Sequence, residues 1–173
     1  MTPILAVDVD GVLNRMSRTA LEPGERLAQV TVPQGTFPIR YRPAMGVKLA
    51  LLATETGAEL TWCTTWEQLA NTHISPLLGF PELPWVPMAP GRVGLRFGDD
   101  RPVGEIKARA LAVYAAGRPW AWFDDDAEPF DLTAARPWSP GSLFRVDDRV
   151  GLTDEHLAKA RDYLMSLKEE TTT

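Results

Sequence analysis

Short, mainly apolar runs recur along the chain, and glycine, proline or polar residues bound each of them. The runs occupy residues 4–7, 58–63, 85–88, 120–123 and 142–146. Apolar runs of this length are typical of buried strands, whereas a helix needs a longer periodic pattern. We therefore predict five strands at these positions.

Segments with apolar residues three or four positions apart lie between most of these runs and predict helices. The predicted helices cover residues 43–56, 66–71, 104–116 and 153–167; in the third, Ile106, Ala110, Leu111 and Val113 are expected to face inward. Strands that alternate with helices predict an α/β fold. We expect a Rossmann-like, three-layer α/β/α arrangement with a mostly parallel sheet between the helices.

Residues 14–43 lack helical periodicity and predict a β-hairpin instead. Residues 29–32 and 37–41 flank Pro33, Gln34 and Gly35, which together are typical of a turn between two strands. No internal repeat or linker interrupts the chain, so we predict one domain over residues 1–173.

Composition and charge narrow the class of protein. The chain has 173 residues, 45% apolar and 24% charged, which is close to the average for soluble globular proteins. The net charge of −5 argues against general nucleic-acid binding but leaves room for a locally basic pocket. Cys63 is the one cysteine, so intramolecular disulfides and cysteine-based zinc clusters are excluded. With neither signal-peptide features nor an apolar run of about 20 residues, we expect a cytoplasmic protein without membrane partners.

Polar residues gather where the predicted strands end. They are Asp8 and Asp10 after the first strand, Thr64 and Thr65 after the second, Asp124, Asp125 and Asp126 after the fourth, and Lys107 in the helix that precedes the fourth. In open parallel sheets, ligands bind outside the carboxyl ends of the strands. These side chains therefore predict one shared site.

Carboxylates that converge at such an edge repel one another. Two of them roughly 4 Å apart cost about 4 kcal/mol at an effective dielectric constant of about 20. A hard divalent cation removes this cost, and oxygen ligation by few side chains suits Mg²⁺, which also binds substrate phosphate. The residues thus predict a magnesium site for a phosphate monoester, whose slow hydrolysis calls for a nucleophile such as an aspartate.

The run Asp8-Val9-Asp10-Gly11-Val12-Leu13-Asn14 resembles the first motif of the haloacid dehalogenase (HAD) superfamily. The resemblance implies that Asp8 is the nucleophile and that Asp10 is the general acid and base. It implies that Thr64, with Thr65 beside it, and Lys107 bind the phosphoryl group. It also implies that Mg²⁺ is held by Asp8, the backbone carbonyl of Asp10, Asp124 and Asp125, in a sheet with the strand order 5-4-1-2-3.

Only about 30 residues separate the first motif from the next helix, which is too few for a large helical cap. We interpret residues 14–43 as a small hairpin-like cap that leaves the site open to bulky substrates. The segment Trp62-Cys63-Thr64-Thr65-Trp66 further resembles a bacterial branch with minimal caps, some members of which occur in RNA-repair proteins.

Three functions remain in competition. The first is a phosphatase for small phosphorylated substrates, and a narrower version acts on nucleotides or on phosphorylated RNA or DNA ends. The second is a phosphoacceptor module similar to response-regulator receivers, although in those the acidic pair comes first and the lysine comes late. The third is a catalytically silent binding domain on the same scaffold.

Overall fold

A parallel β-sheet forms the centre of the structure, a computed structural model that describes residues 1–88, 102–127 and 140–170. Its four strands are β1 (Ile4–Val7), β4 (Glu59–Trp62), β5 (Trp120–Asp124) and β6 (Gly141–Arg145). They lie in the order β4-β1-β5-β6, and every neighbouring pair is parallel. The predicted α/β fold is confirmed, and so is the order of these four strands.

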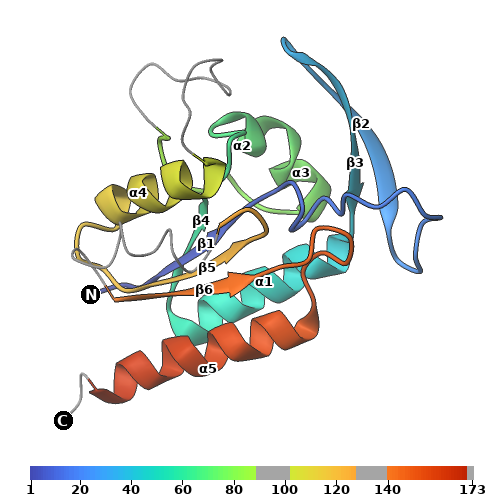
Figure 1. Cartoon of the computed structure of the whole chain (residues 1–173). Helices are drawn as coiled ribbons and strands as arrows, with labels where there is room; N and C mark the ends of the chain where they lie inside the picture. Colours follow the sequence, from blue (N-terminus) through green and yellow to red (C-terminus); the bar gives the residue numbers. More distant parts are fainter. Residues whose placement is uncertain (89–101, 128–139, 171–173) are drawn as a thin grey trace.

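Helices cover both faces of this sheet (Figure 1). On one face lie α1 (Pro43–Thr56) and α5 (Asp154–Glu170), and on the other lies α4 (Val103–Ala115). The side chains of β1 alternate accordingly, because Leu5 and Val7 belong to the apolar cluster beneath α1 and α5, whereas Ile4 and Ala6 belong to the cluster beneath α4. All four are fully buried, which explains why the strand reads as a continuous apolar run.

The predicted third strand is reduced to a single parallel bridge between Trp85 and Trp62. Trp62 donates its backbone N–H to Pro84, and Val86 donates its own to Trp62. Pro84 has no N–H to extend the ladder on one side of this bridge, and on the other side the N–H of Met88 donates to the side chain of Glu67 instead of to β4. The predicted order of five strands is therefore observed, except that the strand expected over residues 85–88, beside β4, is only a bridge.

The last helix, α5, ends three residues later than predicted, and two larger differences concern α2 and α4. The helix expected over 66–71 begins only at Leu69 as α2 (Leu69–His73), followed by α3 (Ser75–Leu78), because residues before it form a turn in which Glu67 has a φ of 46°. In α4, Val113 is 82% exposed and does not face inward. The buried face of α4 instead contains Lys107 and Leu111, and Val113 lies about 200° around the helix from Leu111.

Residues 14–43 contain the predicted hairpin, formed by β2 (Arg26–Val32) and β3 (Gly35–Tyr41). It extends away from the sheet at the end where β1 finishes (Figure 1). Val30 and Ile39 are buried on the face that turns toward the body of the protein. At its base, Arg15 forms two hydrogen bonds of 3.0 and 2.8 Å with Glu25, and both side chains are buried.

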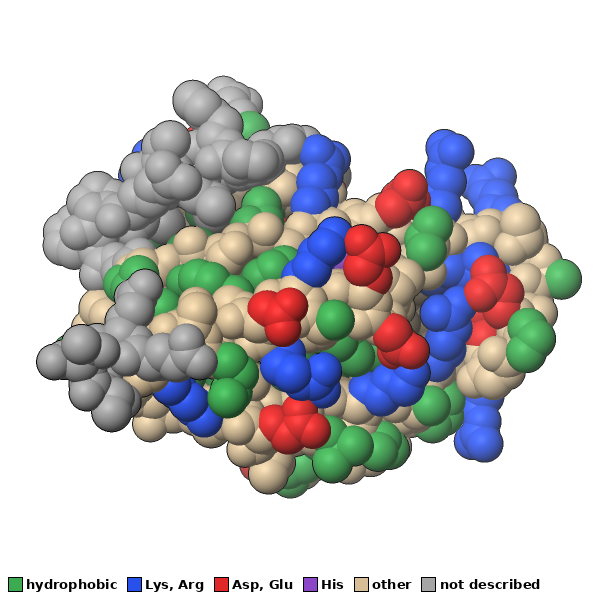
Figure 2. Space-filling view, turned by 90° about the horizontal axis from the view of Figure 1, so that it is seen from below, with side chains coloured by type: hydrophobic (Ala, Val, Ile, Leu, Met, Phe, Trp, Pro, Cys, Tyr) green, Lys and Arg blue, Asp and Glu red, His purple; other side chains and the backbone are tan. Residues whose placement is uncertain are grey.

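The outer surface of α1 and α5 carries charges of both signs side by side (Figure 2). Lys48 pairs with Asp154 across the two helices, and Arg161 pairs with Glu55. Pairs this exposed contribute little stability, and a surface of mixed sign offers no basic stripe for a nucleic acid. None of the described helices combines the length and hydropathy that a bilayer span requires.

Candidate active site

The aspartates predicted from the sequence meet at the carboxyl ends of β1 and β5. Asp8 follows β1 directly, and its backbone N–H donates to Phe123 of β5 at 3.1 Å. Asp124 is the last residue of β5. Because parallel neighbours end at the same edge of the sheet, both carboxyl groups lie at one place. Asp8 is 3% exposed and Asp124 is 0% exposed.

Lys107 reaches this edge from the first turns of α4. Its Nζ lies 2.5 Å from Asp8 Oδ2 and 2.9 Å from Asp124 Oδ2, and the residue is 2% exposed. Burial by itself would lower the pKa of Lys107, but the two carboxylates outweigh it and raise that pKa well above its ordinary value. The ammonium group is therefore charged and held against Asp8.

The remaining oxygens of these carboxylates accept backbone hydrogen bonds. Val9 N–H donates to Asp8 Oδ1 at 2.7 Å. The N–H groups of Asp126 and Ala127 donate to Asp124 Oδ1 at 2.9 and 2.7 Å. Both side chains are thus fixed in direction.

Asp125 completes a group of three carboxylates. One oxygen from each of Asp8, Asp124 and Asp125 lies within 4.8 Å of the others. Among the described residues, Asp125 Oδ1 is buried and accepts no hydrogen bond, so its lone pairs are free to bind a cation beside the other two carboxylates. Burial and the charges of Asp8 and Asp126 raise the pKa of Asp125 to about 7. Burial and the charge of Asp8 raise the pKa of Asp124 to about 8, although Lys107 opposes this.

The charges of this group fit a divalent cation. Three ionised carboxylates and one ammonium leave two negative charges uncompensated. Oxygen donors, one of them orphaned, suit Mg²⁺ better than a softer metal. Gly11 makes room for the side chain of Asp125, because a Cβ at position 11 would lie 2.1 Å from Asp125 Cγ. Asp126 is exposed and lies 3.7 Å from Lys107, outside the group.

The side chain of Asp10 points to other partners. Trp66 Nε1–H donates to Asp10 Oδ2 at 2.7 Å, and Asn14 Nδ2–H donates to Oδ1 at 2.7 Å. Burial raises the pKa of Asp10, while the bonds from Trp66 and Asn14 act to lower it. A carboxyl group with a raised pKa and fixed oxygens is suited to move a proton.

The two threonines lie just beyond β4. Thr64 is 1% exposed, and its Oγ1 accepts the backbone N–H of Trp66 at 3.4 Å. This bond uses one lone pair of the oxygen, so the hydroxyl hydrogen can donate to an anion. Thr65 is half-buried in the same turn and does not cap α2, whose N-cap is Gln68.

Two residues of the site were not predicted from the sequence as partners of Asp10. Asn14 closes the first motif, and Trp66 closes the segment that resembles the minimal-cap branch. The one signal in the sequence is their position, four residues after Asp10 and two after Thr64. Hydrogen bonds between segments that are 56 residues apart have no periodicity that would reveal them.

A parallel α/β sheet with paired aspartates after its first strand, a buried lysine and an acidic end to β5 defines a hydrolase-type domain of the HAD class. The chain matches the family described as the HAD domain in Swiss Army Knife RNA repair proteins over residues 4–157, and it belongs to this family. Comparisons with curated proteins and with solved structures find no match. Family membership places the chain among phosphatase-type hydrolases.

Proposed function

We propose that this protein is a Mg²⁺-dependent phosphomonoesterase that works through an aspartyl phosphate on Asp8. The observation that carries the proposal is the position of Asp8, whose carboxylate contacts Lys107 and lies beside the carboxylates of Asp124 and Asp125. Asp8, Asp124 and Asp125, with the backbone carbonyl of Asp10, would hold the cation. When bound, the cation supplies positive charge to the phosphoryl oxygens.

The chain's own residues then divide the reaction into two steps. In the first, an Asp8 oxygen forms a bond to phosphorus, the bond to the leaving oxygen breaks, and Asp10 gives that oxygen a proton. In the second, a water molecule gives a proton to Asp10 and attacks phosphorus, which releases phosphate and regenerates Asp8. Lys107 and the hydroxyl of Thr64 would bind the phosphoryl oxygens throughout, with Thr65 as the second candidate for that role.

The substrate we favour is a phosphorylated end of a nucleic acid. The family takes its description from RNA repair proteins, which supports this choice. The cap in this proposal is residues 14–43, an insertion into a single domain over 1–173, and a two-stranded hairpin covers less of the site than a helical cap would. A small phosphorylated metabolite remains the alternative substrate.

A substrate panel with MgCl₂ tests the proposal. We expect release of phosphate from an aryl phosphate and from oligonucleotides with a 3′- or 5′-phosphate, and loss of that release in EDTA. Activity confined to mononucleotides and sugar phosphates would remove the nucleic-acid version only. A stoichiometric phosphoprotein without turnover would support a phosphoacceptor module, and an inert protein would contradict the enzyme.

Magnesium should raise the melting temperature more at about pH 8 than at about pH 6. Burial raises the pKa of Asp125 to about 7 and that of Asp124 to about 8, so at the lower pH these carboxyl groups carry protons that a cation must displace. For each proton that must be displaced, the apparent affinity for Mg²⁺ falls about tenfold for every pH unit below the pKa of that carboxyl group. Thermal melts with and without MgCl₂, against NaCl of equal ionic strength, measure the difference. A larger shift at the lower pH would contradict the assigned ligands.

A further inference from the structure

Both oxygens of Asp10 are held by side chains from different parts of the chain. The indole N–H of Trp66 reaches Oδ2 and the amide N–H of Asn14 reaches Oδ1, each at 2.7 Å. A carboxyl group with a single partner can turn about its last torsion angle, but one bonded at both oxygens cannot turn without losing a bond. The direction of the acid is therefore set by Trp66 and Asn14 together.

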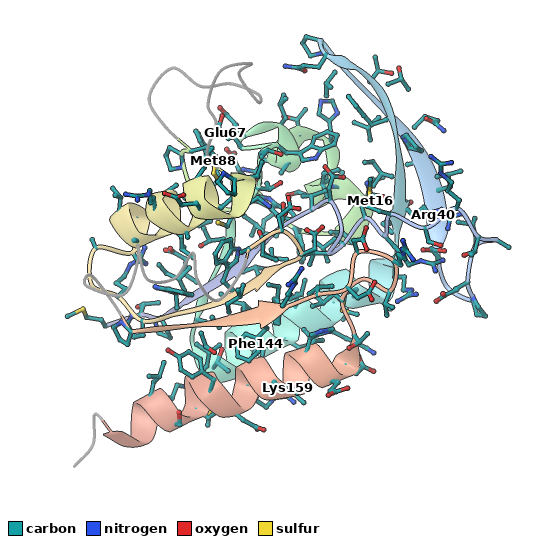
Figure 3. All side chains as sticks on the ribbon, viewed as in Figure 1. Met16, Arg40, Glu67, Met88, Phe144 and Lys159 are labelled. Atoms are coloured by element: carbon teal, nitrogen blue, oxygen red, sulfur yellow. The ribbon has the colours of Figure 1, made fainter. Side chains whose placement is uncertain are left out.

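Each of these partners also contacts strand β3 of the hairpin. The backbone N–H of Arg40 donates to Asn14 Oδ1 at 2.8 Å. The ring of Phe37 packs edge-on against Trp66, with 6.0 Å between the ring centroids and 75° between the planes. Figure 3 shows Arg40 on the hairpin and Met16 on the segment that follows β1, where this segment passes close to the hairpin. One strand thus contacts both residues that hold Asp10.

Tight turns bring the two partners to Asp10. Asn14 returns to the end of β1 because its N–H donates to Val9 and its carbonyl accepts from Gly11, at 2.8 and 2.9 Å. Trp66 lies in the turn after Thr64, and the side chain of Glu67 accepts the N–H of Met88 at 2.8 Å (Figure 3). The side chains of Asn14 and Trp66 both donate to Asp10, and among the described residues neither forms a hydrogen bond with Asp8, so what the two side chains share is the placement of Asp10.

We propose that Trp66 and Asn14 are positioning residues for Asp10, and that hairpin strand β3 sets their positions. The inference rests on the proposed function, in which Asp10 gives a proton to the leaving oxygen and later accepts one from water. Each donor occupies one lone pair of its carboxylate oxygen, so the other side of that oxygen remains for the leaving group or the water. The hairpin would thereby align the acid as well as cover the site.

Substrates whose leaving groups differ in their need for a proton test this positioning role. Protonation matters most for an alkoxide, which is a poor leaving group, and least for a nitrophenolate, which leaves without a proton. Trp66→Phe removes the N–H and keeps a ring against Phe37. We expect it to lower kcat/KM, which reports the steps up to departure of the leaving group and leaves out the hydrolysis common to both substrates, by about tenfold or more on an alkyl phosphate and by less than about twofold on nitrophenyl phosphate. A merely structural role would lower both rates in parallel, and that result would overturn the proposal.

Two further variants test the proposal independently. In an Asp10→Asn background, Trp66→Phe should cause no additional loss on either substrate, and an additional loss would overturn the role assigned to Trp66. Phe37→Leu changes an exposed hairpin residue. Like Trp66→Phe, it should lower the rate on the alkyl phosphate more than the rate on nitrophenyl phosphate, but by a smaller factor. Equal losses on both substrates would overturn the role of the hairpin.

The control is Trp85→Phe, the same substitution at a half-buried tryptophan beside β4, which should leave the ratio of the two rates unchanged. A wild-type protein that turns over neither substrate would remove the proposed function and this inference together. A wild type that turns over both, with a parallel loss in Trp66→Phe, would remove the inference alone.

Discussion

Replacing Asp8 with asparagine is expected to abolish phosphate release, with kcat lowered by at least about 10³-fold. The amide cannot attack phosphorus, and the substitution removes one negative charge from the group formed with Asp124 and Asp125. The protein should remain folded, because the carbonyl oxygen of the new amide can still accept the N–H of Val9. The measurement is kcat on nitrophenyl phosphate with saturating MgCl₂.

Asp162→Asn is the matched control, since Asp162 is exposed on α5 and the same change of charge there should leave kcat unaltered. Mass spectrometry of acid-quenched wild type during turnover should find one added phosphoryl group on the peptide that contains Asp8. A variant that retains more than about a tenth of the wild-type kcat, with no phosphopeptide in the wild type, would exclude Asp8 as nucleophile.

Replacing Lys107 with methionine is expected to cost both stability and activity. The change removes the ammonium group between Asp8 and Asp124 and leaves two buried carboxyl groups without their cationic partner. Loss of one partner from a buried ion pair costs about 3–5 kcal/mol of the free energy of unfolding. We also expect kcat to fall by about 10²-fold or more, because a charge facing the phosphoryl group is lost.

The pH dependence of this loss follows from Asp124. Without Lys107, which lowers it, the pKa of Asp124 should rise further above its value of about 8. A carboxyl group with a raised pKa in the folded state stabilises the fold when protonated, so the variant should lose stability as the pH rises from about 4 toward that pKa. Urea denaturation without metal, at several pH values, measures the trend.

Lys159→Met supplies the comparison, because Lys159 is an exposed lysine of α5 paired only with Glu155 among the described ion pairs. It should change the free energy of unfolding by less than about 0.5 kcal/mol. Adding Asp124→Asn to Lys107→Met should recover part of the lost stability without recovering activity, since it removes the unpaired charge. Equal stabilities of Lys107→Met and wild type would contradict the buried contact.

The sequence by itself determined the strands and the residues at their ends. A buried parallel strand must be apolar along its length, so the runs at 4–7 and 120–123 were readable locally and agree with β1 and β5 to within a residue. Their connection by helices then requires that their carboxyl ends meet, which brings Asp8 and Asp124 together without knowledge of any contact. The order of the four paired strands was predicted from the resemblance to the HAD superfamily and agrees with the structure.

Only the tertiary structure decided how the side chains at that edge divide their work. Asp8, Asp124 and Asp125 form one group, while Asp10 is held by Trp66 and Asn14, because these choices depend on contacts between segments distant in the chain. The face that α4 buries depends on Lys107 reaching two carboxylates, and no apolar pattern predicts a buried lysine. The local pattern of apolar residues predicts which segments are buried strands. Hydrogen-bond partners, in contrast, depend on how the whole chain packs.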